Sequence, residues 1–168
     1  MGLMDILRVI PGVGLMETML DVARDGVHPI RGSILYCDLF GIAEHSGVYI
    51  GNNQIVHLEK SGYVRTSHPF DFVDGTSSVI IRVSAKGASP VGSEDVARRA
   101  ESMVGTKRRY NVLTNNCHRF ASGCLTGSFN NSRTLLSLLK ADAAERIGAK
   151  DWRVWDISEA DFYGYKAE

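Results

Sequence analysis

The chain has 168 residues, a length typical of a single compact domain. Lys plus Arg and Asp plus Glu both total 19, so the net charge is zero and gives no electrostatic reason to expect binding to nucleic acid. Cys37, Cys117 and Cys124 are too few, and odd in number, for a disulfide framework, which indicates a reducing compartment and a cytoplasmic protein.

Residues 1–28 are expected to form an N-terminal helical extension, with two short helices divided by Pro11 and Gly12. Charged side chains interrupt its apolar residues, so it lacks the pattern of a secretory signal. No stretch reaches the ~18 uncharged apolar residues of a membrane span. The second helix carries an apolar stripe, which we interpret as a face packed against the domain. The alternative is contact of these helices with a membrane surface.

Strands are predicted between residues 32 and 85, where β-branched and aromatic residues cluster in short runs. The predicted strands are 33–39, 46–50, 54–58 and 78–83, with a further short strand at 62–66. Gly51, Asn52 and Asn53 predict a hairpin between the second and third of these, because Gly and Asn tolerate a positive φ. Residues 68–77 are predicted to form a loop.

Helices are predicted in the last part of the chain, at 93–105, at 115–125 and from 132 onward. Each begins on Ser or Asn, which are favoured N-cap residues. The tail from residue 150 holds both tryptophans and is therefore expected to be ordered. This order of helices, antiparallel strands and helices predicts one α+β domain, with the sheet packed against helices.

Cys117 is the candidate nucleophile. It directly follows Asn115 and Asn116, so we expect it in the first turn of a helix. Unpaired N–H groups and the positive end of the helix dipole favour a thiolate there. The same N–H groups are suited to binding the oxyanion of a tetrahedral intermediate. Cys37 and Cys124 are expected to be packed in the core instead.

A thiol nucleophile needs a base, and His45 and His57 are the best-placed candidates because they stand at the ends of predicted strands. A second polar group on the neighbouring strand is able to fix the tautomer of the base. A plain two-residue turn at Asn52 and Asn53 puts the two side chains on opposite faces, whereas direct opposition needs a connection centred on Gly51. The hypothesis therefore requires a wider loop or a bulge.

Three segments resemble the signatures of the lecithin–retinol acyltransferase-like family, part of the NlpC-type, circularly permuted papain-like superfamily. They are His45-Ser46-Gly47-Val48-Tyr49-Ile50-Gly51, Val56-His57-Leu58 and Asn116-Cys117-His118-Arg119-Phe120. The order His…His…Cys and the twelve-residue spacing of the histidines are similar too. The resemblance covers about residues 32–125, the expected catalytic core, and leaves 126–168 as a C-terminal helix and tail.

The resemblance implies a permuted papain-like fold with Cys117 as nucleophile, His45 as general base and His57 as the residue that orients His45. It also implies a thiol hydrolase or acyltransferase that forms an acyl-thioester on Cys117 from a lipid-like acyl ester and needs no cofactor. Where the family's motif has an acidic residue and then a histidine after the cysteine, this chain has His118 and Arg119.

Other interpretations stay open from the sequence alone. One is a cysteine peptidase or amidase of NlpC type, acting on a peptide or amide substrate, and another is a non-catalytic binding domain on the same scaffold. A metal site built from His45, His57, Cys117 and His118 is disfavoured, because these residues lack the short paired spacings of zinc ligands. His118 is expected to be a solvated first-turn residue. The sequence gives no indication of the oligomeric state.

Overall fold

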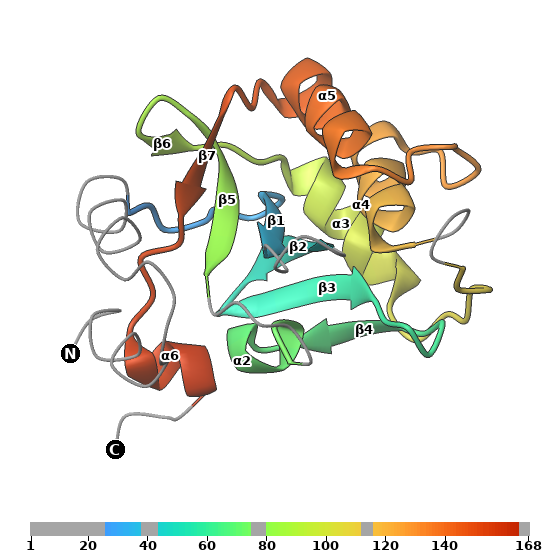
Figure 1. Cartoon of the computed structure of the whole chain (residues 1–168), viewed down its shortest axis with the longest axis horizontal. Helices are drawn as coiled ribbons and strands as arrows, with labels where there is room; N and C mark the ends of the chain where they lie inside the picture. Colours follow the sequence, from blue (N-terminus) through green and yellow to red (C-terminus); the bar gives the residue numbers. More distant parts are fainter. Residues whose placement is uncertain (1–25, 38–43, 75–79, 112–115, 165–168) are drawn as a thin grey trace.

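The computed structural model describes residues 26–37, 44–74, 80–111 and 116–164. In these segments the chain forms one antiparallel sheet of seven strands, in the order β4-β3-β2-β1-β5-β6, with β7 also paired to β5 (Figure 1). The strands are β1 (Ile34–Cys37), β2 (His45–Gly51), β3 (Gln54–Leu58), β4 (Val64–Ser67), β5 (Ile81–Lys86), β6 (Ser89–Pro90) and β7 (Asp151–Val154).

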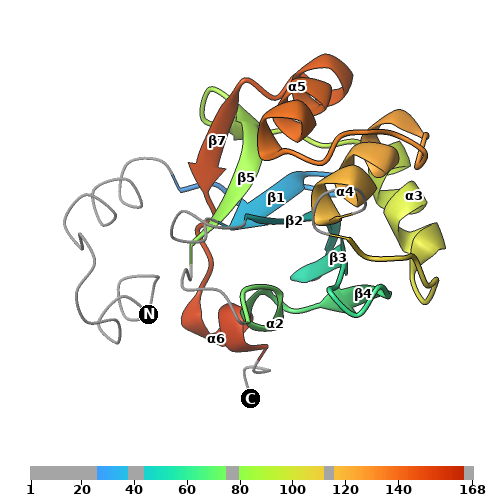
Figure 2. The same cartoon turned by 45° about the vertical axis from the view of Figure 1, so that its right-hand side comes forward.

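Helices cover both faces of the sheet (Figures 1 and 2). One face carries α3 (Glu94–Met103), α4 (Cys117–Thr126) and α5 (Leu136–Ile147). The other face carries the short helices α2 (Pro69–Phe72) and α6 (Glu159–Tyr163). An antiparallel sheet packed against helices is the predicted α+β class, and this prediction is confirmed.

The core has two parts because successive strand residues point to opposite faces of the sheet. Toward α3, α4 and α5 it contains Ile34, Val48, Val56, Phe120 and Leu139. Toward α2 and α6 it contains Leu35, Tyr49, Ile55, Phe72 and Phe162. Even-numbered residues of β2 therefore face α4, whereas odd-numbered residues face α2. This alternation decides which side chains of β2 meet the start of α4.

The β2–β3 connection is the tight hairpin that the sequence predicts. Gly51, Asn52 and Asn53 all have positive φ, at 97°, 51° and 55°. Two consecutive non-glycine residues in this region form a turn whose twist matches that of the strands. The expected conformation at this turn is confirmed.

This hairpin also contains a bulge. Val48 pairs with Val56 in the regular part of the ladder, but the register has shifted where Gly51 pairs with Gln54. The extra residue on β2 shifts the pairing by one position. Odd-numbered residues of β2 before the bulge therefore lie on the same face as odd-numbered residues of β3. The bulge that the catalytic hypothesis required is therefore present.

Several expected boundaries differ from the structure. The third helix begins at Leu136 rather than at Ser132: the N–H of Thr134 donates back to the carbonyl of Ser132 (3.0 Å), and Leu135, the residue before the helix, is extended. Ser93 stands at the start of α3 but makes no capping hydrogen bond through its side chain. The segment predicted as a loop at 68–77 contains α2, which begins on Pro69.

The part of the C-terminal tail that the structure describes, up to residue 164, forms β7 and α6, as expected of an ordered segment. The predicted helices of residues 1–25, and with them any contact with a membrane surface, lie outside the described residues. The same holds for Asn115 and for parts of the strands expected at 33–39 and 78–83.

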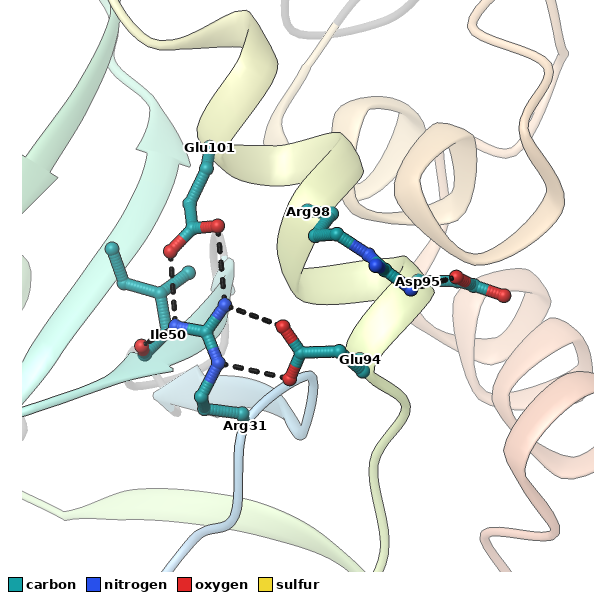
Figure 3. Close-up of polar contacts among 6 residues, drawn as sticks. All are labelled: Arg31, Ile50, Glu94, Asp95, Arg98 and Glu101. Atoms are coloured by element: carbon teal, nitrogen blue, oxygen red, sulfur yellow. Dashed lines mark hydrogen bonds and ion pairs between the residues drawn. The ribbon is translucent and has the colours of Figure 1, made fainter.

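Arg31, just before β1, ties the sheet to α3 (Figure 3). Its guanidinium donates to the carboxylates of Glu94 and Glu101 over 2.9–3.1 Å, and to the carbonyl oxygen of Ile50 on β2. Hydrogen bonds to Glu94 and then Glu101 raise the pKa of Arg31 above its ordinary value. All three charged side chains are partly exposed, so solvent screens the ion pairs.

Candidate active site

Cys117 is the first residue of α4, as the sequence predicts. Asn116 caps the helix: its side-chain oxygen accepts from the N–H groups of His118 (3.1 Å) and Arg119 (3.2 Å). Its side-chain amide donates to the carbonyl of Thr134, just before α5 (2.8 Å). The buried Asn116 therefore fixes the helix start from two sides, and with it the position of the thiol.

The sulfur of Cys117 is buried against the first residues of β2. It lies 3.8 Å from the carbonyl oxygen of Glu44, and the N–H and hydroxyl of Ser46 hydrogen-bond to it. Burial raises the pKa of Cys117, while these bonds and the N–H groups at the start of α4 act in the opposite direction without cancelling the rise. The expectation of a thiolate produced by the helix start is therefore wrong for the resting state, in which a neutral thiol is favoured.

His45 and His57 meet on the α2 side of the sheet. Nε2 of His45 lies 2.7 Å from Nδ1 of His57, and Nε2 of His57 lies 2.7 Å from the hydroxyl of Ser67 on β4. Val48 pairs with Val56, so the next position along the ladder places His57 opposite Gly47. His45 is therefore a diagonal neighbour of His57 and not its direct partner. The bulge puts both imidazoles on one face, as the hypothesis required.

One arrangement of protons satisfies this series and leaves His45 able to accept a proton. His57 donates its Nε2–H to Ser67, and its Nδ1 accepts the Nε2–H of His45. Nδ1 of His45 then carries a lone pair. Ser67 was not predicted to belong to the site, because the strand predicted at 62–66 ends one residue before it. The hydroxyl at the next position on the same face as the histidines was the available signal.

Phe72 covers the two imidazoles, and Gly47 makes room for it. The ring centroid of Phe72 lies 4.8 Å from that of His45 and 5.3 Å from that of His57. A Cβ at position 47 would lie 2.7 Å from Cγ2 of Ile55 and 3.1 Å from Cε2 of Phe72. Only glycine fits there without displacing this apolar cover.

The apolar cover makes protonation of both imidazoles unfavourable. Burial lowers the pKa of His45 well below 6.5, and the positive charges of His57 and His118 add to the effect. Burial lowers the pKa of His57 to about 4. Both imidazoles are therefore neutral at pH 7, which is the state that a general base needs.

His118 is buried, which contradicts the prediction of a solvated residue. It is 5 % exposed and faces β2, with its Nδ1 2.8 Å from the hydroxyl of Ser46. Its Nε2 lies 3.9 Å from Oε2 of Glu44, and burial lowers its pKa to about 4. The second residue of a helix is often solvated, but here α4 packs its first turn directly on β2. The imidazole of His118 therefore belongs to the surroundings of Cys117, in addition to those of His45 and His57.

The other two cysteines are fully buried in the core, which confirms their expected packing role. Cys37 lies in the cluster with Leu35 and Phe72, and Cys124 lies in the cluster with Phe120. Within the part of the chain that the structure describes, no three His, Cys, Asp or Glu side chains are grouped as metal ligands.

The lecithin retinol acyltransferase family model matches residues 27–130, more than half of the chain. The chain belongs to this family. The family match spans every residue of the group described above, from Glu44 to His118, and it ends shortly after α4. A search of curated proteins gave no match.

Membership of the lecithin retinol acyltransferase family indicates acyltransferase or thiol hydrolase chemistry in general terms. The resemblance noted in the sequence motifs is thereby confirmed. Beyond the matched region, β7 pairs with β5, so the C-terminal segment completes the sheet. None of the described helices is both long and apolar enough to cross a membrane.

Proposed function

We propose that this protein is a thiol hydrolase or acyltransferase that acts on a lipid-like acyl ester, with Cys117 as the nucleophile. His45 is the general base, and His57 orients it. The main support is the hydrogen-bonded series His45–His57–Ser67, which leaves Nδ1 of His45 as an acceptor at the strand end where the Cys117 thiol is buried. Family membership supports the class of chemistry.

The reaction begins from a neutral thiol and a neutral imidazole, because burial raises the pKa of Cys117 and lowers that of His45. His45 takes the thiol proton as the sulfur attacks the ester carbonyl carbon, which forms the S–C bond and an oxyanion. The bond to the alcohol oxygen then breaks, and the His45 imidazolium protonates that oxygen. The acyl group stays on Cys117 as a thioester.

Release of the acyl group repeats these steps with a second nucleophile. His45 removes a proton from water or from an acceptor hydroxyl or amine, which attacks the thioester carbonyl. The C–S bond breaks, and the sulfur recovers its proton from His45. Water as acceptor makes the protein a hydrolase, and a second acceptor molecule makes it an acyltransferase.

The start of α4 offers one N–H group for the oxyanion. The N–H groups of His118 and Arg119 are bonded to the side chain of Asn116, and that of Phe120 donates to the Asn116 carbonyl (3.2 Å). The N–H of Cys117 itself is not used by this cap. We assign it to the oxyanion, since it belongs to the residue that carries the attacking sulfur.

Intact-protein mass spectrometry tests this function. Wild type incubated with a phosphatidylcholine should gain the mass of one acyl chain on Cys117 and release fatty acid. Cys117→Ala should do neither, and His45→Ala should acylate about a hundredfold more slowly. Cys124→Ala, which removes another buried cysteine of α4, is the matched control and should behave as wild type.

A parallel incubation with a peptide amide separates the peptidase alternative. Cleavage of the amide with no reaction of the lipid ester would replace the proposed substrate class. Failure of both substrates to modify Cys117 would favour a binding domain instead.

A further inference from the structure

On the α4 side of the sheet, Cys117 has polar neighbours that the mechanism above does not use. Ser46 is completely buried and points toward α4, because it alternates with His45 along β2. Its hydroxyl contacts both the sulfur of Cys117 and, at 2.8 Å, Nδ1 of His118. The serine thus lies between the nucleophile and a second imidazole.

Glu44 supplies the outer end of this group. Its carboxylate lies 3.9 Å from Nε2 of His118, and its side chain is 41 % exposed, so it remains in contact with water. A carboxylate beside Nε2 favours a proton on that nitrogen. Nδ1 of His118 is then an acceptor, and Ser46 is its donor.

This orientation gives the serine oxygen lone pairs that face the thiol. With the hydroxyl hydrogen directed to His118, the Ser46 oxygen can accept the S–H of Cys117 once that S–H turns away from the Glu44 carbonyl, which lies 3.8 Å from the sulfur. The resulting order is thiol, hydroxyl, imidazole and carboxylate. It lies on the opposite face of β2 from the His45–His57–Ser67 series.

We propose that Ser46, His118 and Glu44 form a second proton path from Cys117, so that the nucleophile is served from both faces of the sheet. The proton leaves the sulfur for the Ser46 oxygen while the hydroxyl proton passes to Nδ1 of His118. The products are a Cys117 thiolate and a His118 imidazolium beside the Glu44 carboxylate. This inference rests on the proposed role of Cys117 as nucleophile.

The surroundings of His118 contain the other groups that titrate with it. Glu44 precedes β2, β2 contributes His45, and α4 contributes Cys117. Tyr110 lies near the sulfur, and its pKa is raised by burial and, to a smaller extent, by the charge of Cys117. Of these groups, Glu44 carries the negative charge that stabilises an imidazolium at His118.

Alkylation of Cys117 by iodoacetamide tests this path without any acyl substrate. The rate is read from mass spectra of the Cys117 peptide over a range of pH and reports how readily the sulfur loses its proton. His118→Gln and Ser46→Ala should each lower the rate at neutral pH about tenfold and move the pH profile to higher pH. The double variant should be no slower than the slower single variant, since both changes interrupt one path.

Two further variants complete the test. His28→Gln removes an exposed imidazole and should leave the alkylation rate unchanged. Glu44→Gln changes a side chain that is 41 % exposed, and it should slow alkylation in the same direction as His118→Gln. Wild-type profiles for Glu44→Gln and His118→Gln, or effects of Ser46→Ala and His118→Gln that multiply, would overturn the inference.

These measurements separate the inference from the proposed function. If lipid esters never acylate Cys117 but His118→Gln still slows alkylation, the proton path stands and the substrate class is wrong. If acylation occurs and alkylation does not depend on His118, the reverse holds. Far-ultraviolet circular dichroism of each variant identifies any that fails to fold.

Discussion

At this site, serine hydroxyls influence which ring nitrogen of each histidine carries the proton. In the proton arrangement assigned above, Ser67 accepts from Nε2 of His57 and thereby orders the protons of His57 and His45. On the opposite face, the hydroxyl of Ser46 lies 2.8 Å from Nδ1 of His118, the nitrogen that receives the proton in the proposed path. Because the bond to Ser67 sets which nitrogen of His57 carries the proton, and through His57 that of His45, a residue that touches neither the sulfur nor the substrate controls the base.

Replacing Ser67 with Ala should lower the rate of Cys117 acylation about tenfold, because Nε2–H of His57 loses its acceptor and the opposite tautomer becomes accessible. Ser67→Thr keeps a hydroxyl and should restore most of the rate. Single-turnover acylation kinetics measure the effect. Thr66→Ala is the control, since neighbouring strand residues face opposite sides. Equal rates for Ser67→Ala and wild type would remove the orienting role of Ser67.

Secondary-structure elements place the site where β2 passes the first turn of α4. The Asn116 cap fixes the helix start, and the buried strand residues of β2 face both layers of helices. The position of β2 is set in part by Arg31, which connects Ile50 to two carboxylates of α3. The geometry around Cys117 therefore depends on contacts with α3 that lie away from the site.

Arg31→Met should lower the thermal midpoint by about 2–4 °C at low salt, and the difference should shrink at high salt because the lost contacts are partly exposed ion pairs. Arg98→Met is the matched control, because Arg98 lies on α3, the helix that carries Glu94 and Glu101 (Figure 3). Arg98 forms an ion pair with the exposed Asp95 one turn away on α3, so its loss should change the midpoint little. Equal shifts for the two variants would show that the contact between β2 and α3 adds nothing.

At the scale of the whole molecule, the site is a cluster of uncharged polar groups inside the fold. His57 and His118 are both buried, and burial lowers the pKa of each to about 4 from an ordinary value of 6.5. The unfolded chain takes up protons at these histidines below pH 6.5, whereas the folded protein does not do so until about pH 4. Folding is therefore linked to pH through the same residues that are proposed to serve Cys117.

The free energy of unfolding should be insensitive to these histidines above pH 6.5 and should fall as the pH drops from 6.5 toward 4. The slope is at most about 1.4 kcal/mol per pH unit for each histidine. Urea unfolding at a series of pH values measures it. His118→Gln should reduce the slope in this window, whereas His28→Gln should not. A slope that does not change in His118→Gln would mean that His118 is protonated in the folded protein.

By itself, the sequence determined the parts that depend on local pattern. A run rich in β-branched residues predicted the strand at 54–58, the Asn residues predicted the positive-φ hairpin, and Asn116 predicted a helix start that presents Cys117. The motifs also led to the family that the match confirms. Each of these depends on residues a few positions apart, whose conformational preferences act before any tertiary contact forms.

Only the tertiary structure decided which side chains surround the thiol. His118 is buried because the first turn of α4 packs on β2, and Ser67 reaches His57 because β4 pairs beside β3. The resting thiol is neutral because the fold removes Cys117 from water, which outweighs the helix start that favours a thiolate. Burial and pairing between distant segments depend on how elements pack together, and a local pattern of residues does not specify that packing.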